Sequence, residues 1–334
     1  MKRRTLLGSF AGGAAIASAY HLFSSDLPQI AQTTTPPLST ASTVATSADF
    51  FGLNVGSELS WKSWRSQLIP LYQDLGVRWL RVWYNWADLE PQKGNFQASP
   101  VREALQLAKN KGFRILFVVW GTPTHTGSGK LGALPQAQAL AKYCQWLQAN
   151  LGDLVDAWEI GNEPNLERYH AGTPTEYVRI LATAYEVMRG KKLVIAAAPS
   201  GAAKPHYWQA LFDSGLEQHC DRVNLHPYRQ KPREVVRMVE NFQEIARKPL
   251  WITELGVSAN NGNEQGKAEF TTEVVSMLTS RVEQLFWYRS VQGRKLHPLR
   301  FGIIEAERAA RKVTPLPAYY AYADLARRYR QKAT

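Results

Sequence analysis

Two glutamates follow short apolar segments with the composition of buried strands. Glu163 lies in WEIGNEP at residues 158–164, and Glu254 lies in WITELG at residues 251–256. Two carboxyl groups that converge on one bond can cleave an acetal together, because one protonates the departing oxygen and the other faces the positive anomeric carbon. A single glutamate at the end of a strand is usually a solvated surface residue. The pair, beside Asn162 and nearby aromatic residues, predicts glycoside hydrolysis.

The chain from residue 49 onward alternates apolar and amphipathic segments, which predicts strands alternating with helices. The predicted strands span residues 50–56, 77–83, 114–120, 155–161, 193–198, 222–226, 250–254 and 284–288. The predicted helices span residues 61–75, 100–111, 135–150, 174–189, 205–216, 232–246, 264–278 and 317–329. Strand–helix pairs in this number predict a (β/α)8 TIM barrel. A doubly wound open sheet is the alternative, but it would need a glycine-rich phosphate turn after its first strand, and GLNVG at residues 52–56 is not one.

The ends of the predicted strands should carry the chemistry, because active sites of (β/α)8 enzymes lie at the carboxyl ends of the strands. These ends contain most of the acids, histidines and aromatic residues that stand out in the chain. Glu163 follows the fourth predicted strand and Glu254 ends the seventh. Those two strands face each other across the mouth of a closed barrel. We therefore expect the two carboxyl groups to converge there.

The same segments resemble a known enzyme class. WEIGNEP and WITELG are similar to the acid/base and nucleophile motifs of clan A glycoside hydrolases, and WADLEP at residues 86–91, with Gly94 and Phe96, resembles the segment after that clan's second strand. The resemblance runs from about residue 50 to residue 290, and families 39 and 5 are nearest. The chain departs from the family 39 pattern around Glu254, so neither xylosidase nor iduronidase activity is carried over.

The resemblance implies that Glu163 is the general acid/base and Glu254 the nucleophile of a retaining double displacement. Such a reaction needs Glu254 ionised, and we expect Arg81 and the Tyr228 hydroxyl to donate hydrogen bonds to it. Glu163 must have a raised pKa in the free enzyme. An ion pair inside the barrel, with Glu159 as partner, is the other role open to Arg81.

Further polar residues are expected to assist. Asn162 is placed to hydrogen-bond the 2-hydroxyl of the sugar, a contact that strengthens in the transition state. His226 and Tyr228 resemble the His-x-Tyr segment at the end of the sixth strand in family 5 enzymes, although a purely structural role suits His226 equally well.

Aromatic residues at the strand ends are candidates for stacking on sugar rings. Trp287 is the expected floor under the sugar at the cleavage site, with Tyr288 as the alternative because the sequence leaves the strand parity open. Trp120 is expected to line a further subsite, together with Trp83 and Trp86, and at least one of these three is expected in the core.

The first 48 residues have the pattern of a targeting segment and a tether. Positive charges at residues 2–4 precede two leucines and a small apolar run, similar to a twin-arginine export signal, with ASA at residues 17–19 as a cleavage site. A Sec signal or a retained membrane anchor is the alternative. We expect an export signal at 1–19, a Ser/Thr/Pro-rich linker at 20–48 and a catalytic domain at 49–334, in a protein exported to the periplasm or the extracellular space.

Composition excludes several function classes. The 334 residues carry 40 Lys and Arg against 28 Asp and Glu, a net charge of +12, and include only two cysteines. Neither a disulfide framework nor a cysteine-rich metal site is expected, no pattern indicates nucleic-acid binding, and no apolar run beyond the N-terminus could span a membrane. Residues 289–334 hold eleven Lys and Arg and three acids. This basic end predicts either attraction to acidic polysaccharides or, more commonly, a solvated helix face.

These observations predict an exported retaining glycoside hydrolase that acts on a β-linked oligosaccharide or polysaccharide, with no cofactor and no metal. Two alternatives use the same features. One is a carbohydrate-binding barrel that has lost catalysis. The other is a transglycosylase that uses the same two carboxylates and passes the glycosyl group to another sugar.

Overall fold

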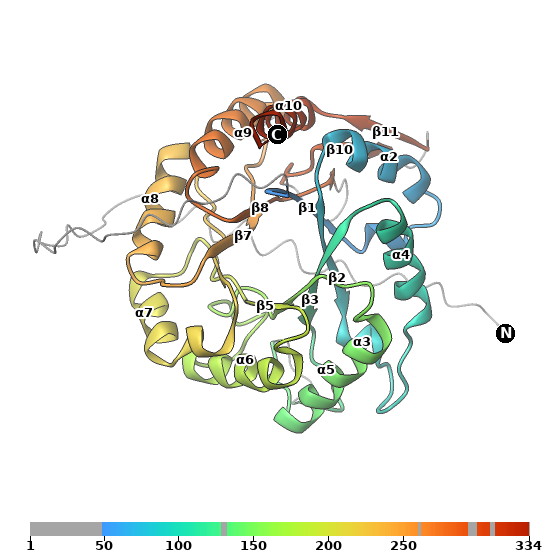
Figure 1. The fold of residues 1–334 in the computed structure, drawn as a ribbon, viewed down its shortest axis with the longest axis vertical. Coiled ribbons are helices and arrows are strands. Elements are labelled where there is room, and N and C mark those ends of the chain that lie inside the picture. Colours follow the sequence, from blue (N-terminus) through green and yellow to red (C-terminus); the bar gives the residue numbers. More distant parts are fainter. Residues whose placement is uncertain (1–48, 128–131, 260–261, 293–298, 308–310, 334) are drawn as a thin grey trace, which may run out of the picture.

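Eight parallel strands form the centre of the molecule, in the order β5-β4-β3-β2-β1-β8-β7-β6 (Figure 1). They are β1 (Phe51–Gly56), β2 (Trp79–Asn85), β3 (Arg114–Trp120), β4 (Ala157–Ile160), β5 (Leu193–Ala196), β6 (Val223–Asn224), β7 (Leu250–Leu255) and β8 (Gln284–Trp287). An isolated parallel bridge between Ile195 and Arg222 joins β5 to the start of β6, so the barrel is nearly closed. The predicted (β/α)8 barrel is confirmed.

The computed structural model describes residues 49–127, 132–259, 262–292, 299–307 and 311–333. The segments predicted as export signal and linker, residues 1–19 and 20–48, lie outside the described residues. Within the described part of the chain, none of the helices has the length and apolar character that crossing a membrane requires.

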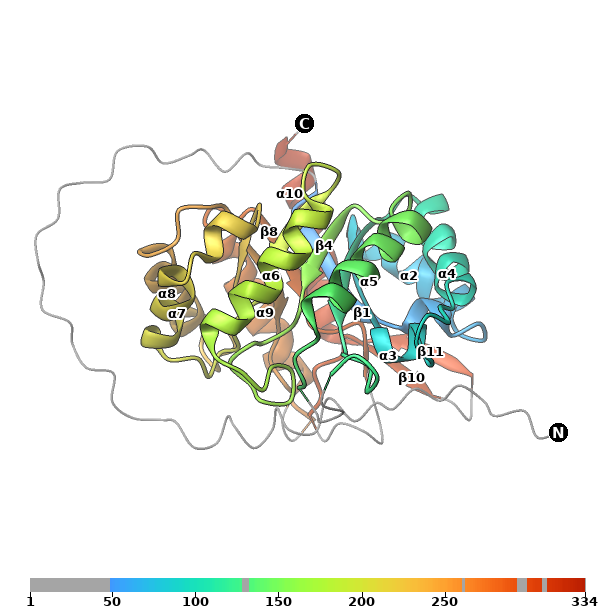
Figure 2. The ribbon, with the colours of Figure 1, turned by 90° about the horizontal axis from the view of Figure 1, so that it is seen from below.

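Helices surround the barrel and connect successive strands (Figures 1 and 2). They are α2 (Arg65–Leu75), α3 (Trp86–Leu89), α4 (Ser99–Asn110), α5 (Ala137–Leu151), α6 (Pro174–Met188), α7 (Pro205–Asp213), α8 (Pro232–Gln243), α9 (Glu264–Leu278) and α10 (Pro317–Ala333). Proline occupies the first turn of several, where its missing N–H costs no hydrogen bond. At the start of α6 the side chains of Thr173 and Glu176 form a reciprocal capping box.

Two layers of inward-facing side chains fill the barrel. An apolar floor lies toward the amino ends of the strands and consists of Trp79, Leu116, Ala157, Ile195, Trp251 and Phe286. Arg81, Glu159 and Thr253 each lie two residues further along strands of this floor. Because side chains alternate along a strand, these polar residues also face inward, one layer nearer the mouth. The polar layer supports the site described below.

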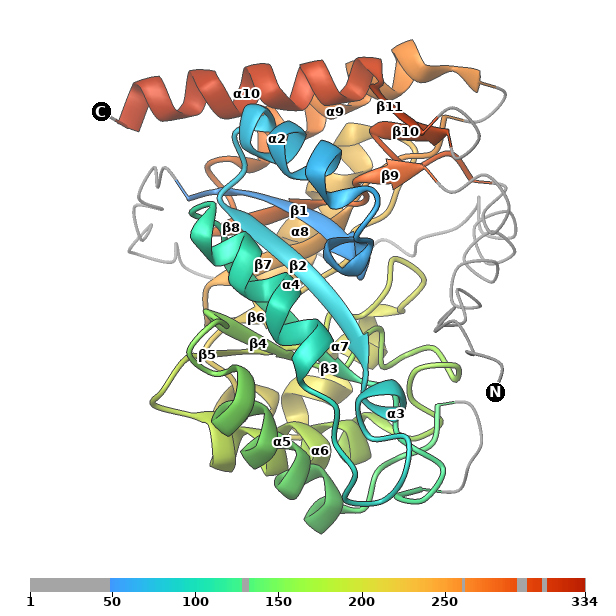
Figure 3. The same ribbon diagram turned by 90° about the vertical axis from the view of Figure 1, so that its right-hand side faces the viewer.

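A small second sheet was absent from the sequence prediction. It contains β9 (Val291–Gln292), β10 (Ile304–Glu307) and β11 (Lys312–Pro315) and follows the last barrel strand. Figure 3 shows it at the same end of the barrel as α3, which follows β2. This is the carboxyl end of the strands, where the site lies.

Helix α10 packs along α9 and α2 (Figure 3). Its inner face is buried, and the Tyr322 hydroxyl donates to the backbone oxygen of Gly52 in β1 at 2.9 Å. On its outer face, Arg327 and Arg328 are exposed. Cys144 and Cys220 are buried free thiols.

Candidate active site

A bulge in β7 brings two consecutive side chains into the barrel. The pairing of β7 with β8 shifts register between Ile252 and Leu255, which interrupts the usual alternation. Thr253 follows the strand parity of Trp251 in the apolar floor, yet Glu254 also contacts interior groups. The bulge therefore directs Glu254 to the mouth of the barrel without displacing Thr253 from the polar layer.

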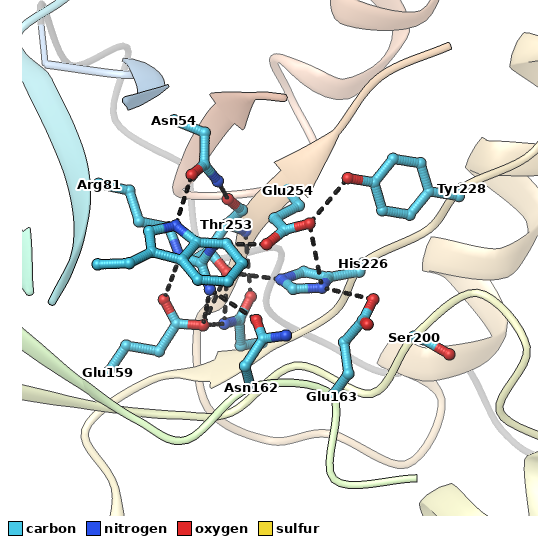
Figure 4. Close-up of polar contacts among 12 residues, drawn as sticks. Asn54, Arg81, Glu159, Asn162, Glu163, Ser200, His226, Tyr228, Thr253 and Glu254 are labelled. Atoms are coloured by element: carbon cyan, nitrogen blue, oxygen red, sulfur yellow. Dashed lines mark hydrogen bonds and ion pairs between the residues drawn. The ribbon is translucent and has the colours of Figure 1, made fainter. Parts of the chain in front are cut away.

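The backbone also turns sharply after β4. Gly161 has φ of 88° and Glu163 has φ of 38°, both in the left-handed region. Glycine adopts this conformation freely, but a glutamate there stores strain on the order of 1 kcal/mol. Residues held in this region often belong to functional sites. The turn points the Glu163 side chain back across the mouth toward β7 (Figure 4).

Glu163 and Glu254 meet at the mouth of the barrel, as the strand positions predicted. One carboxylate oxygen of each lies within 4.8 Å of the other, and Nδ1 of His226 lies within the same distance of both. Each glutamate is only 2% exposed. Two carboxyl groups this close can act on opposite faces of a single sugar carbon, whereas a gap large enough for an intervening water would be about 6.5–9.5 Å.

Glu254 is surrounded by hydrogen-bond donors. Nη1 of Arg81 donates to its Oε1 at 2.5 Å, and the Tyr228 hydroxyl donates to its Oε2 at 2.8 Å. Both donors were expected from the sequence. Charge-assisted hydrogen bonds of this kind favour the ionised carboxylate. Both carboxylate oxygens of Glu254 therefore accept a hydrogen bond.

Arg81 links Glu254 to the polar layer. Its Nε and Nη2 donate to the two oxygens of Glu159 at 2.6 and 2.9 Å, and Nη2 also donates to Oδ1 of Asn162 at 2.9 Å. The two roles considered for Arg81 are thus both filled by one fully buried guanidinium. Since the amide oxygen of Asn162 accepts from Arg81, its NH₂ group remains as the donor for a ligand.

Glu163 lies in a different environment. Burial raises its pKa to about 7, although the positive charges of Arg168 and Arg81 oppose the rise. The Arg168 guanidinium donates to Oε2 of Glu163 at 3.3 Å. A carboxyl group with this pKa is partly protonated at neutral pH and can release its proton to a nearby oxygen.

His226 is fully buried between the two glutamates (Figure 4). Burial, with a smaller contribution from the charge of Arg81, lowers its pKa to about 4, while Glu254 and Glu159 act in the opposite direction. The imidazole is therefore neutral near pH 7. Its Nδ1 lies 3.3 Å from Oε1 of Glu163 and 3.8 Å from Oε2 of Glu254, so it contacts both carboxyl groups. A role of His226 in sugar binding stays a prediction.

The hydrogen-bond network assigns the tautomer of His226. The Thr253 N–H donates to Oδ1 of Asn224 at 3.1 Å, which leaves the Asn224 NH₂ to donate to the Thr253 hydroxyl at 2.8 Å. That hydroxyl donates its only proton to Glu159 at 3.0 Å. It can then only accept from Nε2 of His226, at 2.9 Å. Nδ1 therefore carries a lone pair, and it faces Oε1 of Glu163 at 3.3 Å.

The prediction for Trp287 is wrong. Its side chain is fully buried on the outer side of the barrel, with its ring 5.9 Å from that of Tyr322 in α10. The physical reason is alternation along β8, because Phe286 faces the interior and its neighbour must face the helices. Trp287 is a packing residue between barrel and helix.

Tyr288 lies at the mouth instead. Its ring packs against those of Tyr228 and Phe301, with centroids 6.1 and 5.7 Å away. Burial raises its pKa to about 12, and Arg289 acts against the rise while Glu254 adds to it. The alternative floor named from the sequence is therefore the residue that lies near the carboxylates.

Trp120 and Trp83 form part of an aromatic wall beside the site. Their ring centroids are 5.8 Å apart, and Trp120 also packs edge-on against Tyr169 at 6.1 Å. Trp120, Tyr169 and Asn162 border a cavity of about 60 Å³. Trp86 borders the same cavity but is buried, stacks on Tyr143 of α5 and belongs to the core.

Sequence reasoning missed Arg168 and Tyr169. Both lie in the segment between β4 and α6, and Arg168 stacks over the Tyr169 ring at 4.8 Å. The only signal was their position a few residues after Glu163, in a connection at the carboxyl end of a strand. Such connections build the sites of (β/α)8 enzymes, but their sequence does not reveal which side chains turn inward.

Glu163, His226 and Glu254 are also the group that could offer three ligand atoms to a cation within the described part of the chain. Arg168 and Arg81 already place a guanidinium on each carboxylate, at 3.3 and 2.5 Å. Little uncompensated negative charge remains to attract a cation. The donor set fits proton transfer between carboxyl groups better than metal binding.

The comparisons with known proteins agree with this geometry. Residues 76–299 match the protein-family model described as glycosyl hydrolase catalytic core. No curated protein sequence matches this chain. The beta-glycosidase BGL167 has a similar structure, with TM-score 0.68, 15% identity, and coverage of 84% of this chain and 96% of its own.

Two other solved structures are similar in fold. A family 39 glycoside hydrolase from the gut symbiont Bacteroides cellulosilyticus WH2 has TM-score 0.62 and 19% identity, covering 84% of this chain and 63% of its own. GH5_18 from Streptomyces cattleya has TM-score 0.66 and 18% identity, covering 85% of this chain and 80% of its own. These two neighbours come from the two families that the sequence motifs resemble. The family match over residues 76–299 shows that the chain belongs to the glycosyl hydrolase catalytic core family and is a glycosidase.

Proposed function

We propose that the protein is a retaining β-glycosidase in which Glu163 is the general acid/base and Glu254 the nucleophile. The observation that carries the proposal is the approach of the two carboxylates to within 4.8 Å in contrasting surroundings. Glu254 accepts hydrogen bonds from Arg81 and Tyr228, whereas Glu163 is desolvated and has a raised pKa. The short separation favours a double displacement over direct attack by water.

In the first step, an oxygen of Glu254 bonds to the anomeric carbon as the bond from that carbon to the glycosidic oxygen breaks. Glu163 transfers its proton to the departing oxygen, which leaves as an alcohol. The NH₂ group of Asn162 donates to the sugar 2-hydroxyl. The lone pair of His226 Nδ1 is a hydrogen-bond acceptor for the Glu163 proton until it is transferred.

In the second step, water attacks the anomeric carbon of the glycosyl-enzyme and the bond to Glu254 breaks. Glu163 is now an anion and takes a proton from that water. The esterified Glu254 carries no negative charge, and loss of this charge lowers the pKa of Glu163 toward the value that a base requires. Arg168, which donates to Glu163, stabilises its anionic form at this stage.

The walls of the site and the structural neighbours support the proposed substrate class. BGL167 is described as a beta-glycosidase, which supports a β-linked substrate here. Trp83, Trp120 and Tyr169 line the side of the site with aromatic surface, on which sugar rings stack. A wall of several rings favours an oligosaccharide or polysaccharide over a single sugar.

The stereochemical course tests this function directly. Proton NMR during hydrolysis of a β-glycoside should show the β-anomer of the released sugar first, with the α-anomer appearing later by mutarotation. A first-formed α-anomer would contradict the double displacement. Products longer than the substrate would identify the transglycosylase, and binding of glycans without turnover of any aryl β-glycoside would identify a non-catalytic binding barrel.

We also propose that the protein is exported, because the basic start of the chain is followed by two leucines and a small apolar run. Cell fractionation of the full chain tests this. Replacement of Arg3 and Arg4 by lysine should retain the precursor in the cytoplasm if the twin-arginine route is used. Unchanged export would identify a Sec signal, and recovery of the wild-type chain in the cytoplasm would contradict export.

A further inference from the structure

Arg168 lies beside the proposed acid, on the side away from the nucleophile. Oε1 of Glu163 faces Nδ1 of His226, which in turn lies 3.8 Å from Oε2 of Glu254. Oε2 of Glu163 faces the Arg168 guanidinium at 3.3 Å. Arg168 and Glu254 thus lie on opposite sides of the Glu163 carboxyl group.

That placement corresponds to the leaving-group side of the substrate. The sugar that becomes bonded to Glu254 must lie between the two carboxylates, and the departing oxygen must lie against Glu163. The group attached to that oxygen then extends past Glu163. Arg168 and the ring of Tyr169, over which it stacks, flank this position.

The charge of Arg168 is poorly compensated. Its ion pair with Glu163 is the sole one that it makes within the described part of the chain. Its Nε is buried with no hydrogen-bond partner there. When Glu163 holds the proton that it donates, no described residue provides an ionised counterion within ion-pair distance of Arg168. A guanidinium offers five donors in a rigid fork, so most of its capacity is unused in this state.

Arg289, at the same end of the barrel, differs from Arg168 in its counterion, although its Nε is likewise buried without a hydrogen-bond partner among the described residues. It follows Tyr288 and its Nη2 donates to the carboxyl group of Glu58 at 2.9 Å. Glu58 in turn accepts from Tyr72 at 2.8 Å and from Ser290, so this pair belongs to a connected buried network. Arg289 has a structural partner that is not part of the reaction, whereas Arg168 does not.

We propose that Arg168 forms an anion subsite for a carboxylate on the leaving group, so that the enzyme cleaves glycans whose leaving-group sugar is a uronic acid. This inference rests on the proposed function, because it takes Glu163 as the acid. The guanidinium fork matches a carboxylate in geometry as well as charge. The side chain of Arg168 is 16% exposed, which leaves it accessible to a bound sugar.

Such a substrate would also assist the first step. A carboxylate that pairs with Arg168 withdraws part of the positive charge that favours ionisation of Glu163. The proton then stays on Glu163 until the glycosidic oxygen takes it. Approach of an acidic glycan is favoured as well by the protein's net charge of +12.

A pair of aryl β-glycosides tests the subsite with leaving groups that differ in charge and little in shape. The sugar is the one that gives turnover in a panel of aryl β-glycosides, and the aglycones are 3-hydroxybenzoate and 3-hydroxybenzamide. Wild type should favour the benzoate over the benzamide in kcat/KM, and R168Q should reduce this preference about tenfold or more, the range for a charge-assisted hydrogen bond. R168K should keep part of the preference.

The control is R179Q, which removes the same charge from an exposed position on α6. It should keep the wild-type preference, and rising salt should weaken that preference in both enzymes. An equal loss on both aglycones in R168Q would assign Arg168 to the protonation of Glu163 alone and overturn the anion subsite. A preference for the benzamide in wild type would overturn it as well.

A binding experiment separates failure of the subsite from failure of the proposed function. Calorimetry compares a disaccharide that ends in a uronic acid with its uronamide, using wild type and R168Q. Tighter binding of the acid that is lost in R168Q, together with no turnover of any glycoside, would keep the subsite and reject the hydrolase. Turnover with equal binding of acid and amide would keep the hydrolase and reject the subsite.

Discussion

A carboxylate oxygen of Glu163 and one of Glu254 lie within 4.8 Å of one another, yet the two carboxyl groups have contrasting environments. Two donors, Arg81 and Tyr228, each donate a hydrogen bond to an oxygen of Glu254. Burial raises the pKa of Glu163 to about 7. Neighbouring carboxyl groups whose environments diverge in this way can serve as base and acid at one pH. The predictions below follow from that difference.

Removal of the acid should affect substrates according to their leaving groups. Glu163→Ala should lower kcat/KM on natural glycans about 100-fold or more, the usual contribution of general acid catalysis. Aryl glycosides with strongly acidic phenols need little protonation, so their first step should be far less affected. Steady-state kinetics on both substrate types checks this. Equal losses on both would show that Glu163 is not the acid.

The activity should fall at alkaline pH because Glu163 must carry a proton to donate it. With a pKa of about 7, the protonated fraction decreases tenfold per unit at higher pH. We expect kcat/KM on a poorly activated glycoside to decline above about pH 7. A profile that stays flat to pH 9, or that already declines near pH 5, would be incompatible with the assignment.

Thr253 should determine where the pH profile of kcat/KM declines on its alkaline side, which is called the alkaline limb below. Its hydroxyl holds His226 in the Nε2–H tautomer, so that Nδ1 presents a lone pair to Glu163. In Thr253→Val the imidazole can place its proton on Nδ1 and donate to ionised Glu163. This change lowers the pKa of Glu163, so the limb should move to lower pH.

The control for that experiment is Thr253→Ser, which keeps the hydroxyl and should keep the wild-type limb. Thr253→Val should also lower the free energy of unfolding by about 1–3 kcal/mol, because Asn224 and Glu159 each lose a partner. A valine variant with reduced kcat and an unmoved limb would mean that Thr253 is only structural.

Trp287 and Tyr288 should give opposite responses although they are adjacent. Trp287→Ala should cost about 3–5 kcal/mol in the free energy of unfolding, because it empties a packed site against Tyr322, and it should leave KM unchanged in the fraction that is folded. Tyr288→Ala should raise KM. Thermal unfolding and kinetics on both variants check this. A raised KM in the Trp287 variant alone would show that Trp287, and not Tyr288, contacts the sugar.

The sequence was sufficient for the features that depend on local pattern. Apolar segments of strand length alternate with amphipathic ones, so the barrel and the ends of its strands could be placed. Glu163 and Glu254 stand at two such ends, and their convergence follows from the closure of the barrel. Arg81 was named as a donor to Glu254 or, alternatively, as the partner of Glu159, and in the structure it makes both contacts.

The misses arise from side-chain direction. The parity of β8 is set by Phe286 facing the floor, and nothing local to residues 284–288 distinguishes that register from the one that would place Trp287 inside. The segment WITELG gives no sign of the bulge in β7, so only the structure reveals that the side chains of both Thr253 and Glu254 face inward. Arg168 turns toward Glu163 because of how the β4–α6 connection folds.

Identification of the nucleophile tests the account most directly. The purified protein is incubated with a panel of activated 2-deoxy-2-fluoro β-glycosides, and its intact mass is measured before peptide mapping. We predict one added glycosyl group, located on the peptide that contains Glu254. An adduct on the peptide that contains Glu163, or hydrolysis with inversion and no adduct, would contradict the assignment of Glu254 as nucleophile.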